Sequence, residues 1–279
     1  MLLLTAFSLA FLVQSYFYLF FFRKYTSYQP SRNLTETFSV SVVVCAKNEA
    51  ENLKKILTSL AQQKHSSFEI ILVDDASTDN SLNEMLAFEK AHLDASFTVT
   101  LIPIKQGDSN GKKAALAEGI RAAKNPYILL TDADCLPSSN QWITQMSARF
   151  SEKTAIVLGY GAYEKINNSF LNKLIRFETL LTALQYFSYA LNEKTYMGVG
   201  RNLAYKKETF IKAGGFDEHA HIKSGDDEMK KQKAWLVGML LGVMAGLPLN
   251  GLADGTAVVW YDEAWTLFSD GSFISTLIE

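Results

Sequence analysis

Residues 68–79 read FEIILVDDASTD, and this stretch indicates the fold more clearly than any other part of the sequence. The four consecutive apolar residues from Ile70 to Val73 are typical of a strand that is buried on both faces of a sheet. Two carboxylates, Asp74 and Asp75, follow directly where this strand should end. A buried strand that ends in acidic residues predicts a parallel α/β sheet, in which ligands gather at the carboxyl ends of the strands.

Strand-like and helix-like segments alternate on both sides of this stretch. Before it, a β-branched run at 38–46 is followed by apolar residues at helical spacing over 49–62. After it, the same alternation predicts helices at 80–92 and 113–123 and strands at 98–104 and 127–131. The order of these segments predicts an α/β fold with a mostly parallel sheet and flanking helices.

The composition excludes several classes of protein. The chain has 27 Lys and Arg residues against 29 Asp and Glu residues, so it lacks the overall positive charge that holds nucleic acid, and we expect no nucleic-acid partner. Its two cysteines, Cys45 and Cys135, belong to no Cys/His cluster in the sequence. This spacing argues against a disulfide framework and against a structural zinc site, and it favours a reducing compartment.

The N-terminal segment 1–24 predicts a transmembrane anchor. No charged side chain occurs between Met1 and Phe22, and about 20 apolar residues are enough to cross the hydrocarbon core of a bilayer. Arg23 and Lys24 follow at once, and basic flanks are typical of the cytoplasmic side. We therefore expect a membrane protein whose catalytic domain faces the cytoplasm.

The composition changes again after Glu228, so we divide the remainder into a catalytic domain at 38–228 and an atypical tail at 229–279. The tail begins with Met229 and three lysines within five residues, and an apolar run at 234–249 follows. This pattern is typical either of a short second membrane helix or of a signal-like segment that is foreign to the domain. Both interpretations stay open.

Asp132 and Asp134 follow the predicted strand at 127–131. Alternate residues that leave an extended strand project to the same side, so these carboxylates can bind one divalent cation. Mg²⁺ or Mn²⁺ held by carboxylates and substrate phosphates is typical of nucleotide sites. Phosphatases with an aspartyl nucleophile share the Asp-x-Asp pattern, but they need Thr or Val where Leu136 stands.

Two further segments carry polar groups that suit a nucleotide or an acceptor. Lys112 opens a predicted helix after Gly111 and can meet a phosphate, although a solvated basic turn explains it nearly as well. The segment is not a P-loop, because Lys113 stands where Ser or Thr is required. Further along, Gly200-Arg201-Asn202 precedes the acidic triplet Asp226-Asp227-Glu228, which can present a general base to a cleft.

In order and spacing, these segments resemble the motifs of the family 2 glycosyltransferases, which are membrane-associated enzymes with the GT-A fold. The resemblance spans residues 39–228. It rests on Lys47-Asn48-Glu49, on Val73 to Asp79, on Gly111-Lys112, on Asp132-Ala133-Asp134, and on Gly200-Arg201-Asn202 with the later Gly225-Asp226-Asp227. It implies a GT-A fold for this chain.

The resemblance also implies roles for individual residues. Asp75 would hold the base or ribose of the donor, and Asp132 and Asp134 would engage the metal and the diphosphate. Asp227 would be the catalytic base, with Asp226 in the preceding acidic position. We assign the remaining donor-binding positions to Asn48, Glu49, Asp74 and Lys112, and the acceptor side to Gly200, Arg201 and Asn202.

The implied activity is metal-assisted, inverting transfer of a sugar from a nucleotide sugar to a hydroxyl group. We expect a UDP-sugar as the donor and a glycan or a lipid-linked glycan as the acceptor. After Glu228 the chain departs from the family, because the usual amphipathic helix and Gln-x-x-Arg-Trp motif do not follow. A catalytically impaired remnant that still binds nucleotide is therefore one alternative, and a nucleotidyltransferase is another.

The segment 169–190 predicts a long helix with an apolar stripe that includes Phe170, Leu174 and Phe177. Such a stripe favours a helix packed in the core. The alternative is a helix that lies in the membrane interface.

Overall fold

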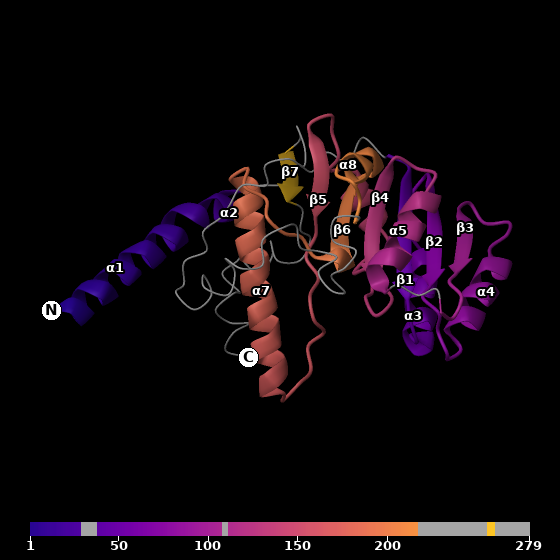
Figure 1. Ribbon diagram of the computed structural model, residues 1–279, viewed down its shortest axis with the longest axis horizontal. Coiled ribbons are helices and arrows are strands. Elements are labelled where there is room, and N and C mark those ends of the chain that lie inside the picture. The colour runs from indigo at the N-terminus through magenta and orange to yellow at the C-terminus, as the bar shows by residue number, and fades with distance from the viewer. Residues whose placement is uncertain (29–37, 108–110, 217–255, 260–279) are drawn as a thin grey trace.

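The computed structural model describes residues 1–28, 38–107, 111–216 and 256–259 (Figure 1). Asp226, Asp227 and most of the predicted tail at 229–279 lie outside these residues. Figure 1 shows a long N-terminal helix that projects away from an α/β body, with the helix α7 standing between them.

A seven-stranded sheet in the order β3-β2-β1-β4-β6-β5-β7 forms the centre of the body. Its strands are β1 (Val40–Ala46), β2 (Phe68–Asp74), β3 (Thr98–Pro103), β4 (Tyr127–Asp132), β5 (Thr154–Leu158), β6 (Leu203–Lys206) and β7 (Thr256–Val259). The first four strands pair in parallel, which confirms the prediction of a mostly parallel sheet. Strand β6 runs antiparallel to both β4 and β5, so the sheet is mixed at this side.

Strand β7 lies within the segment that we predicted to be an atypical tail. It pairs in parallel with β5, so these four residues of the tail add a strand to the sheet.

Helices cover both faces of the sheet, as the alternating pattern predicts. They are α3 (Ala50–Ala61), α4 (Ser81–Ala91), α5 (Lys112–Ala122), α6 (Trp142–Ser147) and α8 (Lys207–Lys212). Helices α3, α4 and α6 share one hydrophobic core with the sheet, and α5 packs with α8 residues in a second core on the other face. Burial on both faces explains why β1 and β2 are nearly continuous apolar runs.

Helix α3 shows how the sequence pattern produces the packing. Leu53, Ile56, Leu57 and Leu60 recur at helical spacing, and all four side chains are buried against the sheet. Because α3 joins two parallel neighbouring strands, β1 and β2 carry their polar ends to the same edge of the sheet. That edge is where the candidate site lies.

The N-terminal helix comprises α1 (Leu2–Tyr16), a π-helical turn η1 (Phe17–Phe21) and α2 (Arg23–Ser27). Its most apolar stretch of 18 residues has a mean hydropathy of 1.7, and among the described residues this is the one helix that is long and apolar enough to span a membrane. The end of this helix packs on α7 (Phe170–Leu191): the Tyr25 ring lies 5.8 Å from that of Phe187, and the Phe21 ring 4.6 Å from that of Tyr189.

Helix α7 agrees in extent with the helix predicted at 169–190, but its apolar stripe was interpreted wrongly. The first half of the stripe is exposed, with 81% of Phe170, 50% of Leu174 and 40% of Phe177 accessible to solvent. The buried face of α7 is its other side, which carries Ala183, Tyr186, Phe187 and Ala190 into a third core. Periodicity identified one face of the helix correctly but did not reveal what covers that face.

Candidate active site

The loops after β1 and β2 are joined by the side chain of Asn48. Its Oδ1 accepts a hydrogen bond from the backbone N–H of Thr78 at 2.7 Å, and its own backbone N–H donates to Ser77 Oγ at 3.0 Å. Asn48 and Ala76 both have positive φ angles, of 60° and 56°, which non-glycine residues seldom adopt. The hydrogen bonds hold both loops in this conformation at the edge of the sheet.

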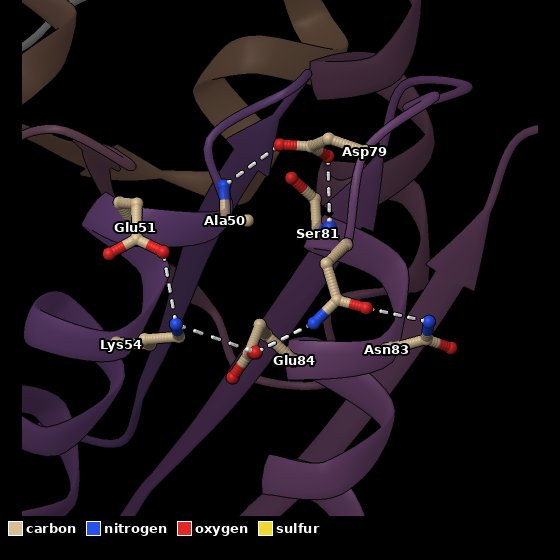
Figure 2. Close-up of polar contacts among 8 residues, drawn as sticks. Ala50, Glu51, Lys54, Asp79, Ser81, Asn83 and Glu84 are labelled. Carbon is tan, nitrogen blue, oxygen red and sulfur yellow. Dashed lines mark hydrogen bonds and ion pairs between the residues drawn. The ribbon is translucent and has the colours of Figure 1, made fainter.

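Asp79 and Glu49 continue this connection into the two following helices (Figure 2). The Asp79 carboxylate accepts from the backbone N–H of Ala50 at 3.2 Å and from that of Ser81 at 2.9 Å. Hydrogen bonding from Ser81 lowers the pKa of Asp79 below its usual value. The Glu49 backbone N–H donates to Ser81 Oγ at 2.8 Å. Asp79 therefore links the first residues of α3 and α4 by accepting from a backbone N–H of each helix.

Figure 2 also shows Lys54 of α3 between two carboxylates. Its Nζ lies 3.0 Å from Glu51 Oε1 and 4.0 Å from Glu84 Oε1 of α4. The contact of Lys54 with Glu84 is a second link between the helices that follow the two loops, and the contact with Glu51 lies within α3.

Asp74 and Asp75, predicted to bind the donor, are both buried. Asp74 Oδ2 accepts from the backbone N–H of Ser77 at 3.3 Å, whereas Asp74 Oδ1 is buried without a hydrogen-bond partner among the described residues. Asp75 Oδ2 lies 3.6 Å from Lys47 Nζ. A buried carboxylate oxygen that lacks a partner is costly, so the surroundings of Asp74 favour a polar ligand.

Lys112 and Asp132 meet at the same edge of the sheet, where Lys112 Nζ lies 2.9 Å from Asp132 Oδ1. Lys112 begins α5, and Asp132 is the last residue of β4. Both residues line one shallow pocket together with Cys45, Leu116, Leu130, Thr131 and Gly200. The structure thus brings predicted donor-binding, metal-binding and acceptor-side residues into one place.

Asp132, Asp134 and Cys135 form a cluster in which one ligand atom from each residue lies within 4.8 Å of the other two. The Cys135 thiol is 3.4 Å from Asp134 Oδ1, and burial, reinforced by the Asp134 charge, raises the pKa of this thiol to about 12. A neutral thiol is a weak ligand for Mg²⁺ or Mn²⁺, whereas carboxylate oxygens suit both ions. The chemistry of the two aspartates therefore fits a divalent cation.

The Gly200-Arg201-Asn202 segment forms a 3₁₀ turn, η2 (Gly200–Asn202), directly before β6. Asn202 Nδ2 donates to the backbone oxygen of Tyr160 at 2.8 Å, so its amide is engaged within the fold. The Arg201 guanidinium lies over the Tyr163 ring, 5.2 Å from its centroid, and its charge lowers the pKa that Cys135 would otherwise have. Arg201 therefore brings positive charge to the side of the Asp132–Cys135 cluster.

A comparison with known families identifies the domain that contains the Asp132–Asp134 motif and its neighbouring loops. The model of glycosyl transferase family 2 matches residues 41–214, which include the whole of the site described above. The chain belongs to this family. Its mixed α/β, mostly parallel sheet is that of a family 2 glycosyltransferase domain with the GT-A fold.

Curated relatives match parts of this family 2 domain. The poly-beta-1,6-N-acetyl-D-glucosamine synthase of Staphylococcus epidermidis is 30% identical over 95 residues, which are 34% of this chain and 21% of that protein. The poly(ribitol-phosphate) beta-glucosyltransferase of Bacillus spizizenii is 24% identical over 208 residues, which are 74% of this chain and 31% of that protein. The matched regions thus span about a fifth to a third of the length of these relatives.

Among solved structures, the chain resembles the mannosyltransferase PcManGT from Pyrobaculum calidifontis, determined in complex with GDP-Man and Mn²⁺. The TM-score is 0.61 at 18% sequence identity, and the match covers 98% of this chain and 73% of the mannosyltransferase. At this identity the likeness shows a shared fold and no more.

Three residues of the candidate site received no role in the sequence analysis. Lys47, which we had quoted only as part of the Asn48 motif, pairs with Asp75. Cys45 lines the pocket, and Cys135 lies in the carboxylate cluster, although we had considered both cysteines only as possible disulfide or zinc residues. The signal was present for Cys135, because it directly follows Asp134. The predicted base Asp227 and its neighbour Asp226 lie outside the described residues, so their placement in the site stays a prediction.

Proposed function

We propose that this chain transfers a sugar from a nucleotide-sugar donor to an acceptor hydroxyl. One observation supports this most strongly: the ion pair of Lys112 with Asp132 lies in a pocket beside Asp134, inside the region that matches glycosyl transferase family 2. The names of the curated relatives, both of which act in the synthesis or glycosylation of polymers, support a glycan as the product. A UDP-sugar is the proposed donor, and a glycan or lipid-linked glycan is the proposed acceptor.

The donor would bind across the carboxyl ends of β1, β2 and β4. Asp75, held beside Lys47, would accept a hydrogen bond from the base or ribose, and Asp74 has a buried oxygen that a polar ligand would satisfy. Lys112 would contact the diphosphate. Asn48 and Glu49 would act at the rim of the same site, where they join the two loops.

Asp132 and Asp134 would hold Mg²⁺ or Mn²⁺. A bound divalent cation supplies positive charge that stabilises the diphosphate as it departs. Lys112 and Arg201 would add positive charge at the same place, since Lys112 pairs with Asp132 and Arg201 lies within electrostatic reach of Cys135. The site would thus concentrate positive charge where negative charge develops.

The proposed reaction is a single displacement at the anomeric carbon. The acceptor oxygen forms a bond to this carbon, the bond from the carbon to the phosphate oxygen breaks, and the nucleoside diphosphate leaves. Asp227 would take the proton of the attacking hydroxyl, with Asp226 beside it, and attack opposite to the leaving group inverts the anomeric configuration. Gly200, Arg201 and Asn202 would border the acceptor side of the pocket.

The apolar N-terminal helix supports a membrane anchor. Arg23 and Lys24 follow its apolar part, and basic residues are enriched on the cytoplasmic side of membranes. We therefore propose that the catalytic domain faces the cytoplasm.

The test uses the full chain in lipid bilayers, with Mn²⁺ or Mg²⁺ and a panel of nucleotide sugars. We expect release of a nucleoside diphosphate from at least one nucleotide sugar, slowly with water and faster with an acceptor glycan. Binding of nucleoside diphosphate without any turnover would indicate an impaired remnant of such an enzyme. Pyrophosphate release from a nucleoside triphosphate and a sugar phosphate would indicate a nucleotidyltransferase instead.

A further inference from the structure

Helix α7 carries large apolar side chains that the described fold does not cover. Phe170, Leu171, Leu174 and Phe177 are 81%, 65%, 50% and 40% exposed. Phe170, Leu174 and Phe177 follow one another at spacings of four and three, and Leu171 lies three residues before Leu174, so the four form a continuous surface, which we call the α7 stripe. Contiguous apolar surface of this kind is typical of a contact with another protein or with a membrane.

The α7 stripe lies on a well-formed helix and not on a frayed end. Ser169 Oγ caps the helix by accepting from the backbone N–H of Asn172 at 3.2 Å. The buried Asn172 side chain in turn bonds the backbone N–H of Ile166 at 2.9 Å and the backbone oxygen of Glu164 at 3.0 Å. These hydrogen bonds fix the preceding loop against the helix, so the stripe has a defined orientation.

The other end of α7 is fastened to the helix that we propose to be the membrane anchor. Lys24 Nζ donates to the backbone oxygen of Leu191 at 3.3 Å, and Asn192 Nδ2 donates to that of Phe21 at 3.4 Å. The aromatic contacts of Phe21 and Tyr25 with α7 reinforce this junction. The position at which the anchor would leave the bilayer is therefore also the C-terminal end of α7.

The direction of α7 places the stripe on the side of this helix where α1 lies. In Figure 1, α1 and α7 diverge at an oblique angle from their common junction. Helix α1 lies on the side of α7 that faces away from the sheet. The stripe is opposite the face of α7 that packs on the sheet through Ala183, Tyr186 and Ala190. Two exposed lysines lie near the stripe: Lys165 in the loop before α7 and Lys173 in the first turn of α7. Their positive charges are complementary to anionic lipid headgroups.

From these observations we propose that the α7 stripe lies in the headgroup and upper acyl region of the bilayer that α1 spans. The inference rests on the membrane anchor in the proposed function. Two attachments, one spanning and one interfacial, would fix the orientation of the catalytic domain on the membrane. The segment at 159–169, which leads from beside Arg201 into α7, would then place the acceptor side of the pocket close to the lipid surface.

The test labels the unmodified full chain in bilayers with a lipid that carries a photoreactive diazirine on its acyl chain. Peptides are analysed by mass spectrometry after irradiation. Labelling of the α1 peptide serves as the positive control. The matched negative controls are the peptides with Leu93 and Ile211, which are 78% and 62% exposed but belong to other parts of the fold.

We expect labels on residues 166–177 at a yield several-fold above that of the Leu93 and Ile211 peptides. The triple variant Phe170→Ser, Leu174→Ser, Phe177→Ser should lose most of this labelling while keeping the label on α1. Its nucleoside diphosphate affinity should stay unchanged, which separates this inference from the donor-binding claim and verifies that the variant is folded.

Labelling of α1 without labelling of residues 166–177 would overturn the inference. A parallel sample is treated with a bifunctional protein cross-linker; links between residues 166–177 of two chains, without lipid labels there, would show that a second copy covers the stripe and would overturn the inference. If α1 itself carried no label, neither helix would contact the bilayer, and the inference would be overturned. Each of these results leaves the donor-binding assay free to succeed or fail separately.

Discussion

The indole Nε1 of Trp142 donates a hydrogen bond to Asn202 Oδ1, 3.0 Å away. Trp142 begins α6, downstream of the Asp132–Asp134 motif, whereas Asn202 ends the turn that holds Gly200 and Arg201. The side-chain Nδ2 of Asn202 also donates a hydrogen bond to the backbone oxygen of Tyr160. Asn202 therefore fixes the turn that holds Arg201 relative to the loop that carries the acidic motif.

The close packing around Asn202 requires a glycine at position 159. A Cβ at Gly159 would overlap the Asn202 side chain, and the Gly159 backbone N–H donates to the Asn202 backbone oxygen at 2.9 Å. We expect Gly159→Ala to destabilise the protein by about 1–3 kcal/mol, because a tightly packed region must shift to accept the methyl group. Urea denaturation measures the change in the free energy of unfolding.

A double variant provides the control for this prediction. Asn202→Ala alone should be destabilising, since it removes two hydrogen bonds, but Gly159→Ala should cost much less in the Asn202→Ala background. Equal costs of Gly159→Ala in both backgrounds would show that the two side chains do not interfere.

The ion pair of Lys112 with Asp132 leads to a prediction about donor affinity. Lys112→Met keeps much of the apolar stem but removes the charge that we propose contacts the diphosphate. We expect the Kd for a nucleoside diphosphate to rise about ten- to a hundredfold, the range for loss of a charge-assisted hydrogen bond. Lys90→Met, an exposed lysine on α4, is the matched control. An unchanged Kd for Lys112→Met would mean that Lys112 pairs with Asp132 for structural reasons only.

His65 leads to a prediction about pH. Its Nε2 lies 2.9 Å from the backbone oxygen of Phe38 and its Nδ1 lies 3.1 Å from Thr144 Oγ1. Burial lowers the pKa of His65 below its usual value of 6.5, against a smaller opposing effect of the Phe38 hydrogen bond. The folded state therefore binds fewer protons than the unfolded state just below pH 6.5, so stability is fully present above that pH and falls as the pH drops.

We expect the His65→Gln variant to lose less stability than the wild type between pH 7 and pH 5, a range about the ordinary histidine pKa. Urea denaturation across this range provides the comparison, and the difference between the two proteins removes the contribution of carboxylates. Parallel pH profiles for the two proteins would refute a lowered pKa at His65.

The predicted base leads to a kinetic prediction. Asp227→Asn keeps the size of the side chain but removes its ability to accept a proton, so transfer should fall at least ~10²-fold while nucleoside diphosphate affinity persists. Asp226→Asn is the neighbouring control. If Asp226→Asn abolishes transfer and Asp227→Asn does not, the base assignment moves by one residue.

The sequence predicted the parallel half of the fold well, because burial on both faces forces long apolar runs with clear ends. The predicted strand at 68–73 agrees with β2 to one residue, and the predicted helix at 80–92 agrees with α4 to one residue at each end. Strands β5 and β6 were not predicted. They contain only five and four residues, and their antiparallel pairing depends on contacts distant in the sequence.

The sequence predicted the site residues whose positions depend on the carboxyl ends of the parallel strands. Asp132 and Lys112 meet because β4 and α5 both place polar residues at that edge. The roles of Asn48 in joining two loops and of Asn202 in binding Trp142 were not predictable, because each depends on partners from another element. For the α7 stripe, the pattern identified the face but not its surroundings.

The central claim is that Asp132 and Asp134 bind a nucleoside diphosphate together with a divalent cation. Titration calorimetry of the full chain with UDP and GDP, in the presence of Mn²⁺ or of a chelator, tests it most directly. We predict binding of at least one nucleotide that requires Mn²⁺ and is lost in Asp134→Asn, but is retained in the exposed control Asp94→Asn. Equal affinity with and without the cation, or unchanged affinity in Asp134→Asn, would contradict the assignment of this site.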